Sequence, residues 1–520
     1  MSQDSEVNGH VSAKLPYKIL EDKDLGRHVV ATRDMEVGEV VLEEMPLVMG
    51  PAQATEPVCL GCLNALQKGQ IEECERCGWP VCSQKCAASK HHRAECDWTI
   101  KKRGQKVKIS NFGSSHPSYE CITALRCLEK RQSDPKNVEE MTALESHCDL
   151  RKVTPRYDLD RRTIAGFLHR FFKVEQDYSE EEILKICGVL QINGHENPLT
   201  QPASVAVYER ASLFEHSCHP NCGKRFTDDN SLVIQTVKKI KAGDHLSICY
   251  TDPLWGTLNR RHHLLETKFF LCKCPRCIDP TELGTYYSAV SCPNKECDWY
   301  VLLDTEKDDL NPETLNWICK KCNSTRTASN VQSVVQRIMT DLDAMDKNDE
   351  KSCKLFLDYY GKSNLLHPNH FILTEVRLSL AQLYGQKTDK GIQEIPDADL
   401  EHKTELCKQV LKLARQLFVA EWRVQGALLF ELHAAVAERC RRDADAGLLD
   451  QAALISRLME SRYYLEEALK MLKNEPEALP EGKISIQCQI NLTELDSLLQ
   501  RIRHSMGNVQ FENKDKINTK

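Results

Sequence analysis

The spacing of hydrophobic residues changes along the chain and predicts strands in some regions and helices in others. Short apolar runs rich in β-branched residues, separated by turn residues such as Gly38, predict β-strands from about Tyr17 to Met49 and over residues 201–250. The clearest runs are Val29–Ala31, Val40–Leu42, Leu232–Val237 and Leu246–Tyr250. Residues 101–190 have a mostly helical pattern with a charged face.

Beyond about residue 325 the apolar residues recur every three or four positions, which is typical of amphipathic helices. The stripes begin at Leu373, Leu406 and Leu454, and each continues for several turns. Successive helices of this length predict an array of helical hairpins. Because no clean repeat consensus recurs, the tetratricopeptide architecture is only a possible description of this array.

Composition narrows the class of protein. A chain of 520 residues predicts about three domains, and 41% hydrophobic with 28% charged residues suits a globular protein. A net charge of -7 argues against a general nucleic-acid coat protein. No apolar run is long enough to span a membrane, and the polar start MSQDSEVNGHVSAK predicts no secretory leader. We therefore expect residence in the nucleus, the cytoplasm or both.

The 25 cysteines change this picture, because a reducing compartment makes metal binding a better explanation than disulfides. Eight ligands follow in short pairs: Cys59-x2-Cys62, Cys74-x2-Cys77, Cys82-x3-Cys86 and His92-x3-Cys96. They suffice for two tetrahedral zinc sites. His91 competes with His92, and we favour His92 because its gap to Cys96 matches one helical turn.

A second cysteine block contains two sets of ligands. Cys292, Cys297, Cys319 and Cys322 form a complete set and predict a separate zinc ribbon. The other set, Cys272, Cys274 and Cys277, lacks a fourth ligand. Three upstream cysteines are candidates for it: Cys218, Cys222 and Cys249.

Two further motifs make the order of these blocks along the chain specific. Residues 211–222 have the sequence ASLFEHSCHPNC, and residues 243–252 have the sequence GDHLSICYTD. Strands, a paired cysteine block, helices, these motifs and a Cys-x-Cys-x2-Cys cluster follow one another over residues 16–325. This order resembles the SMYD family of lysine methyltransferases, in which a MYND zinc finger splits a SET domain. The run DPTELGT at 279–285 and the extra ribbon resemble the arthropod SmydA branch.

The resemblance implies an α+β protein: a β-rich SET fold split by a MYND zinc finger, a post-SET zinc region, and an α-helical, tetratricopeptide-like C-terminal domain. The expected divisions are a disordered tail at 1–14, the N-terminal part of SET at 15–58, the MYND finger at 59–96, a helical insert at 97–190, the C-terminal part of SET at 191–256, the post-SET region with its ribbon at 257–325, the helical domain at 326–505 and a tail at 506–520.

The resemblance also implies the ligand sets. Cys59, Cys62, Cys82 and Cys86 would bind one zinc, and Cys74, Cys77, His92 and Cys96 a second. Cys218 would complete the zinc site of Cys272, Cys274 and Cys277, and the ribbon would hold a fourth ion.

The implied methyl donor is S-adenosylmethionine, and the acceptor is a lysine of a protein. Tyr250 would be catalytic and would line the methyl-transfer channel. The residues implied to contact the cofactor are Gly26, Arg27, His28, Asn193, Glu215, His216, Tyr250 and Phe270.

Two of these positions depart from the family pattern. Glu215 stands where the family has asparagine before His-Ser-Cys, and a carboxylate accepts hydrogen bonds but cannot donate them. His28 stands where the family has the second glycine of Gly-x-Gly, and its ring would crowd a close backbone approach. The alternative function is therefore a catalytically degenerate scaffold that recruits proline-rich partner proteins through the MYND finger.

The expected partners are a lysine-containing protein substrate and proline-rich proteins. The basic cluster Lys101, Lys102, Arg103 and Lys106 is a small charged face, and we expect no direct nucleic-acid binding from it. The C-terminal helices would gate peptide access, so deleting residues from about 330 onward would change peptide selectivity more than cofactor affinity.

Overall fold

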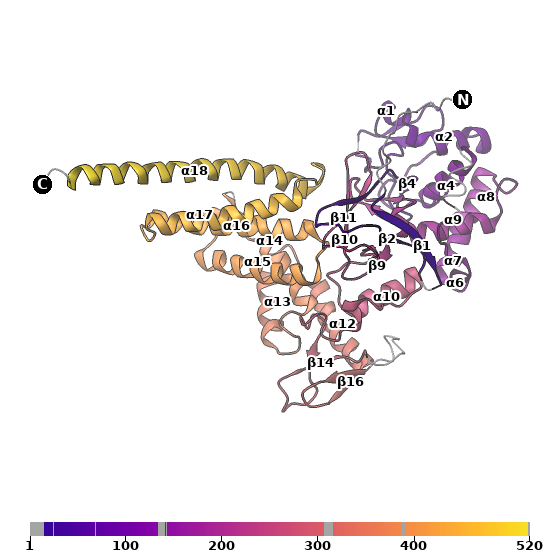
Figure 1. Ribbon diagram of the computed structural model, residues 1–520. Helices are drawn as coiled ribbons and strands as arrows, with labels where there is room; N and C mark the ends of the chain where they lie inside the picture. The colour runs from indigo at the N-terminus through magenta and orange to yellow at the C-terminus, as the bar shows by residue number, and fades with distance from the viewer. Residues whose placement is uncertain are drawn as a thin grey trace, which may run out of the picture.

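The computed structural model describes residues 15–517, except for 24, 68, 134–140, 142, 306–315, 387 and 389. Figure 1 shows the N-terminal half of the chain, in indigo to magenta, as a body of strands covered on one side by helices. The C-terminal helices, in orange and yellow, extend from the opposite side of the strands, and a small sheet projects below. The predicted tail at 1–14 lies outside the described residues.

The central body is made of short strands that form several small sheets. Its strands are β1 (Tyr17–Asp22), β2 (Gly26–Ala31), β3 (Val40–Glu44), β4 (Val48–Pro51), β7 (Gly194–Asn197), β8 (Ser204–Val207), β9 (Glu215–His216), β10 (Cys222–Phe226), β11 (Leu232–Thr236) and β12 (Ser247–Ile248). The sheet orders are β1-β2, β10-β11-β3, β4-β8-β7 and the parallel pair β12-β9. The four clearest runs predicted as strands all fall on or overlap these elements.

Two distant stretches of chain build this body together. Strand β3 pairs with β11, with Leu42 opposite Ile234, and β4 pairs with β8. Leu42 and Ile234 are buried in a common apolar core with Phe214. Because every residue of β11 is buried, this strand has the continuous apolar character of a central strand.

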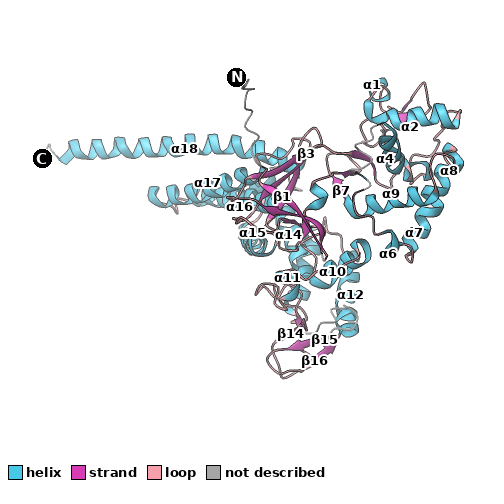
Figure 2. Ribbon diagram, turned by 45° about the vertical axis from the view of Figure 1, so that its right-hand side comes forward, coloured by secondary structure: helices cyan, strands magenta, loops and turns pink. Residues whose placement is uncertain are grey.

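The segment between β4 and β7 forms a two-stranded finger and a layer of helices beside the sheets (Figure 2). Its elements are β5 (Glu72–Glu73), β6 (Pro80–Val81), α1 (Gln84–Ala87), η1 (Lys90–His92), α2 (Arg93–Trp98), η2 (Thr99–Arg103), α3 (Pro117–Glu120), α4 (Ile122–Ser133), α6 (Cys148–Arg151), α7 (Pro155–Asp160), η3 (Arg161–Ala165), α8 (Gly166–Phe172) and α9 (Glu180–Asn193). Trp79 joins the finger to these helices. Its indole nitrogen donates to Thr99 Oγ1 at 2.9 Å, and its ring meets Tyr119 edge-on.

After the sheets, the chain forms a helix, a cysteine turn and a small antiparallel sheet. These elements are η4 (Ala211–Leu213), which precedes β9, then α10 (Thr257–Lys268), α11 (Pro275–Ile278), β13 (Val290–Ser291), β14 (Tyr300–Leu303), β15 (Asn316–Cys319) and β16 (Thr325–Thr327). The four strands pair in the order β13-β14-β15-β16. They form the small sheet at the bottom of Figure 1.

The C-terminal region is a row of helices packed on their neighbours. The helices are α12 (Ala328–Ala344), α13 (Glu350–Lys362), α14 (Phe371–Leu383), η5 (Gly391–Glu394), α15 (Asp397–Leu417), α16 (Trp422–Asp445), α17 (Gln451–Leu472) and α18 (Pro480–Ile517). Val410, Leu413 and Leu417 are buried, as their period predicts. Among the described residues, no helix is both long enough and apolar enough to cross a membrane.

One predicted boundary differs from the structure. The helical domain was expected to end at residue 505, with a tail at 506–520, but α18 continues as a helix to Ile517. The polar composition of this stretch suggested a tail, although Glu, Gln and Lys are good helix formers and extending an existing helix needs no new nucleus.

Candidate active site and metal centres

The predicted cysteine and histidine ligands gather in four groups, and within each group the ligand atoms lie within 4.8 Å of one another. The groups are Cys59–Cys62–Cys82–Cys86, Cys74–Cys77–His92–Cys96, Cys218–Cys272–Cys274–Cys277 and Cys292–Cys297–Cys319–Cys322. Sulfur–sulfur separations are 3.7 Å for Cys62 and Cys82 and 3.9 Å for Cys218 and Cys272. A tetrahedron of Zn–S bonds of about 2.3 Å has edges of about 3.8 Å, so these donor sets fit zinc.

His92, rather than His91, belongs to the finger's second group. His92 is fully buried, and its Nε2 atom lies 3.2 Å from Cys77 Sγ, whereas His91 is exposed. Its Nδ1 atom lies 3.0 Å from Glu95 Oε1. A carboxylate behind a ligating imidazole fixes both the tautomer and the orientation of the ring.

Glu95 is in turn held by Arg126 of α4. The guanidinium donates to Oε1 at 2.7 Å and to Oε2 at 3.1 Å, and it also donates to the Met49 carbonyl of β4 at 2.8 Å. Burial alone would raise the pKa of Glu95, but Arg126 and His92 lower it to about 2. This chain of contacts ties the finger to the central sheets.

The third group takes Cys218 as its fourth member. Cys218 follows β9, and its Sγ lies 3.5 Å from Cys277 Sγ. The other two candidates lie elsewhere: Cys249 Sγ faces the Thr251 carbonyl at 3.2 Å, and Cys222 lies on β10. Phe270 and Tyr250 pack against this cysteine group.

A cavity of about 1850 Å³ lies beside the third cysteine group. Its wall includes all eight residues implied to contact a cofactor: Gly26, Arg27, His28, Asn193, Glu215, His216, Tyr250 and Phe270. They come from the β1–β2 hairpin, the end of α9, strand β9 and the segments after β12 and α10. Gly26 has a φ of 65°, a conformation that favours glycine, and it begins the strand that brings His28 to the cavity.

His216 connects Tyr250 to the third cysteine group. The Tyr250 backbone N–H donates to His216 Nδ1 at 3.0 Å, and His216 Nε2 lies 3.2 Å from Cys218 Sγ. Because a backbone N–H only donates, Nδ1 must be the acceptor, which leaves the Nε2 proton facing the sulfur. The cysteine group therefore fixes the position of Tyr250 through this ring.

The Tyr250 hydroxyl donates to the Phe214 carbonyl. Burial, followed by the charge of Glu215, raises the pKa of Tyr250, so the phenol keeps its proton at neutral pH. Asn193 has its amide group occupied in the same wall, since Nδ2 donates to the carbonyls of Glu145 at 2.8 Å and Val189 at 3.0 Å. Its amide oxygen is the atom left to face a ligand.

The structure adds a charged residue that the sequence did not suggest. Lys268, the last residue of α10, lines the cavity and donates to the carbonyls of Gln191 at 2.9 Å and Ile192 at 2.8 Å. Its ammonium lies 5.9 Å from the centre of the Tyr250 ring. Burial, with a contribution from Lys224, lowers the pKa of Lys268 to about 8. A lone lysine at a helix end carries no motif that would have revealed this position.

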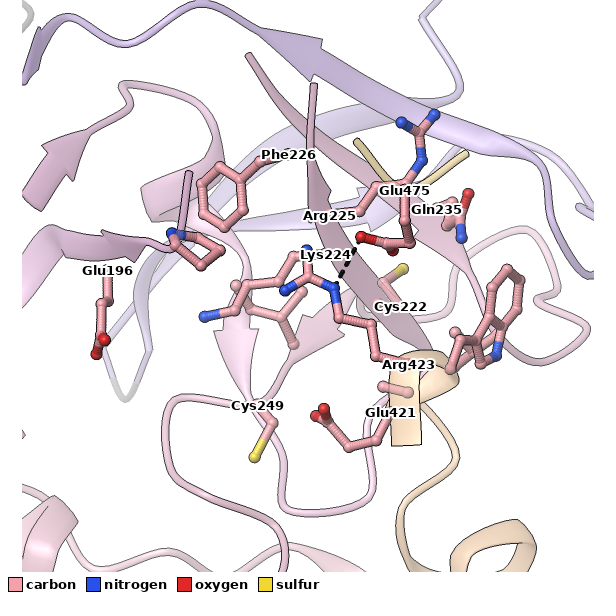
Figure 3. A pocket seen from close by; sticks show the side chains of 16 residues that line it. Glu196, Cys222, Lys224, Arg225, Phe226, Gln235, Cys249, Glu421, Arg423 and Glu475 are labelled. Carbon is pink, nitrogen blue, oxygen red and sulfur yellow. Dashed lines mark hydrogen bonds and ion pairs between the residues drawn. The ribbon is translucent and has the colours of Figure 1, made fainter. Parts of the chain in front are cut away.

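A smaller cavity of about 270 Å³ adjoins the first, at the junction of β10 with the C-terminal helices (Figure 3). Lys224, Cys249 and Glu421 line both cavities. Figure 3 shows the Arg423–Glu475 ion pair, at 2.8 Å, on one wall. Burial raises the pKa of Glu421, which precedes α16.

One region of this chain matches a known domain family. The SET domain model matches residues 26–251 of this chain. Among curated proteins, it is similar to members of the SMYD family. "SET domain-containing protein SmydA-8, isoform A" of Drosophila melanogaster is 28% identical over 305 residues, which is 58% of this chain and 63% of that protein.

A second relative is similar over a shorter part of the chain. "Histone-lysine N-methyltransferase SMYD3" of Mus musculus is 28% identical over 268 residues, covering 48% of this chain and 59% of that protein. This chain thus matches less than two thirds of the length of either relative. The solved structure of "Rubisco LSMT bound to AdoMet" aligns over 95% of this chain and 92% of that one, at 15% identity and with a TM-score of 0.27.

Proposed function

We propose that this chain is an S-adenosylmethionine-dependent protein-lysine N-methyltransferase. The observation that supports this most is the convergence of residues from distant segments, such as Gly26, Asn193 and Phe270, on one cavity. The name of the SMYD3 relative, a histone-lysine N-methyltransferase, is consistent with it. A small-molecule pocket is usually ~300–1,000 Å³, so a cavity of about 1850 Å³ has room for a cofactor and a lysine side chain.

The residues present suit this cofactor chemically. Asn193 offers an amide oxygen and Glu215 a carboxylate for an amino group, while Phe270 offers an aromatic face for an adenine ring. When bound, S-adenosylmethionine supplies an electrophilic methyl group on a positively charged sulfur. No covalent nucleophile from the protein is then needed, so the protein's task is positioning, which contributes up to ~11 kcal/mol in favourable cases.

Tyr250 is the proposed catalytic residue. Because its phenol is protonated and donates to the Phe214 carbonyl, it orients the substrate amine and does not act as a base. The nearby Lys268 ammonium disfavours a second cation, which promotes the neutral form of the substrate lysine. The proton released by that lysine leaves to solvent.

The substrate is a lysine-containing segment of a histone or another protein. Residues flanking the target lysine would extend into the smaller cavity, since Lys224 and Glu421 line both spaces. We propose that each of the four ligand groups holds one zinc ion and that the finger recruits proline-rich proteins. A role in regulating gene expression, in the nucleus or the cytoplasm, would follow from such substrates.

The proposal is tested by calorimetric S-adenosylmethionine binding and by methyl transfer to lysine peptides, with Tyr250→Phe beside the wild type. We expect saturable cofactor binding by both proteins and at least ~100-fold slower transfer by the variant. Tyr208→Phe is the matched control, because Tyr208 is also a buried tyrosine whose hydroxyl donates to a carbonyl, that of Asn230 at 2.7 Å. It should retain near-normal transfer.

A wild type that binds no cofactor would overturn the enzyme proposal. Restoration of binding by Glu215→Asn would then favour the degenerate scaffold, since asparagine stands at this position in the family pattern. Equal losses in Tyr250→Phe and Tyr208→Phe would show that the hydroxyl at 250 has no special part in transfer.

A further inference from the structure

The two residues that depart from the family pattern, His28 and Glu215, are joined through a third residue, His245. Glu215 Oε2 lies 3.1 Å from His245 Nδ1. The rings of His245 and His28 are stacked, with centroids 4.8 Å apart and planes 11° apart. His28 and Glu215 line the large cavity, whereas His245 is outside its wall. The departures thus form one connected unit.

The backbone fixes this unit from both sides. His245 forms a bridge with Val30 of β2, and the next residue, Leu246, accepts from the Glu215 N–H of β9 at 3.3 Å. The chain around residue 245 therefore lies between the strand that carries His28 and the strand that carries Glu215. As a result, His28 and Glu215, on different strands, both contact the side chain of His245.

The contacts also determine which atoms of His28 and Glu215 remain available to a ligand. His28 is only 3% exposed, and its Nδ1 lies 3.0 Å from the Gly26 carbonyl of its own hairpin, so the ring is held against the wall. The His245 contact occupies Oε2 of Glu215. Its Oε1 has no hydrogen-bond partner among the residues that the structure describes, so it is free to accept from a ligand.

We infer that His245 is a positioning residue, which holds the Glu215 carboxylate against the cavity so that Oε1 accepts from the ammonium of the cofactor's amino-acid part. This inference rests on the proposed function. The His28 ring stacks on His245 and supports it from the other side. It also fills the space that a glycine at position 28 would leave empty. Glu215 and His28 are then a matched pair that retains cofactor binding by a different set of contacts.

The test compares two ligands by calorimetry. S-adenosylmethionine carries the amino-acid part, whereas 5′-methylthioadenosine lacks it and retains the adenosine. His245→Phe keeps a ring that stacks on His28 but removes the donor to Glu215. We expect it to weaken S-adenosylmethionine binding about tenfold, the usual scale of a hydrogen bond to a charged group, and to change 5′-methylthioadenosine binding less than about twofold.

Two further variants separate positioning from a structural role. His245→Gln keeps an N–H donor and should restore S-adenosylmethionine affinity to within about threefold of the wild type. In a Glu215→Gln background, His245→Phe should have an effect of less than about twofold, because the carboxylate that it orients is gone. Thermal unfolding of each variant establishes that it is folded before titration.

The outcomes are distinct. Equal weakening of both ligands by His245→Phe, or no change in either, would overturn the inference while leaving the proposed function in place. Failure of His245→Gln to restore affinity would also overturn it. A wild type that binds 5′-methylthioadenosine but not S-adenosylmethionine would contradict both the inference and the proposed function.

Discussion

At the scale of single residues, side chains in the wall of the large cavity are held by hydrogen bonds to residues far away in the sequence. Lys268 is the clearest case, because it donates to the last carbonyls of α9, next to Asn193. A cation at a helix C-terminus is favourable there, but the same burial lowers its pKa to about 8. The charge at this position of the cavity wall therefore depends on pH.

Lys268→Met should alter how stability depends on pH. From about pH 8 to 10.5, the folded protein holds fewer protons at Lys268 than the unfolded chain, so this group makes stability rise with pH across that window. The free energy of unfolding of the wild type, relative to the variant, should therefore increase by on the order of 2–3 kcal/mol between these values.

Urea unfolding at several pH values measures this difference. The exposed Lys412→Met is the matched control and should leave the slope as it is in the wild type. A constant difference between wild type and Lys268→Met across the window would contradict the assigned direction of the pKa change.

At the scale of elements, the finger and the helical layer depend on the link between α2 and α4. Arg126 of α4 and Glu95 of α2 are both buried, with side-chain exposures of 6% and 0%. Removing one partner of such a pair leaves a charge buried without compensation, which costs far more than the net value of the pair.

Arg126→Met should destabilise the protein by about 3–5 kcal/mol and speed zinc release from the His92 site, because Glu95 loses the group that holds it against His92. Chemical unfolding gives the first quantity, and a chromogenic zinc chelator gives the second. Arg93→Met, at a residue of α2 with 78% side-chain exposure, should change stability by less than about 0.5 kcal/mol. Similar zinc release rates in both variants would contradict the proposed link.

The sequence predicted local relations well and distant ones poorly. Candidate ligands such as Cys59 and Cys62 are a turn apart, so spacing alone predicted that they group together, and the choice of His92 over His91 followed from one helical turn. The family motif then singled out Cys218, which spacing had left open. Arg126 and Lys268 were not predicted. Their hydrogen-bond partners lie 31 and 77 residues away in the sequence, and a local sequence pattern does not indicate contacts over such distances.

At the scale of the whole molecule, the helical region and the zinc ribbon share one apolar core. Tyr287, Trp317 and Phe371 are buried in it together. Glu282, in the DPTELGT run, is buried against Arg260 and Arg276 and so connects the third cysteine group to this core. Deleting residues from about 330 onward would expose that core, so point substitution is the better test of the helical region's effect on peptide selectivity.

Glu421→Gln provides that test. Glu421 faces both cavities and has no ion-pair partner among the described residues, so it is suited to a basic side chain beside the target lysine. We expect the KM for a peptide with such a neighbour to rise about tenfold, and S-adenosylmethionine affinity to change less than about twofold.

Peptides with and without an arginine next to the lysine measure the preference. Glu477→Gln, at an exposed position near Glu475, is the control and should leave both constants unchanged. An equal rise in KM for both peptides would show that Glu421 does not recognise the arginine next to the lysine.

The pairing of β3 with β11 has a consequence for how the protein is made. Leu42 and Ile234 are about 190 positions apart, so at ~5–20 residues per second a ribosome needs on the order of 10–40 s to supply the partner of β3. During that time the finger ligands, from Cys59 to Cys96, are already complete and able to take up metal. Given metal, the finger is therefore able to fold while β3 and β4 still lack their later partners, β11 and β8.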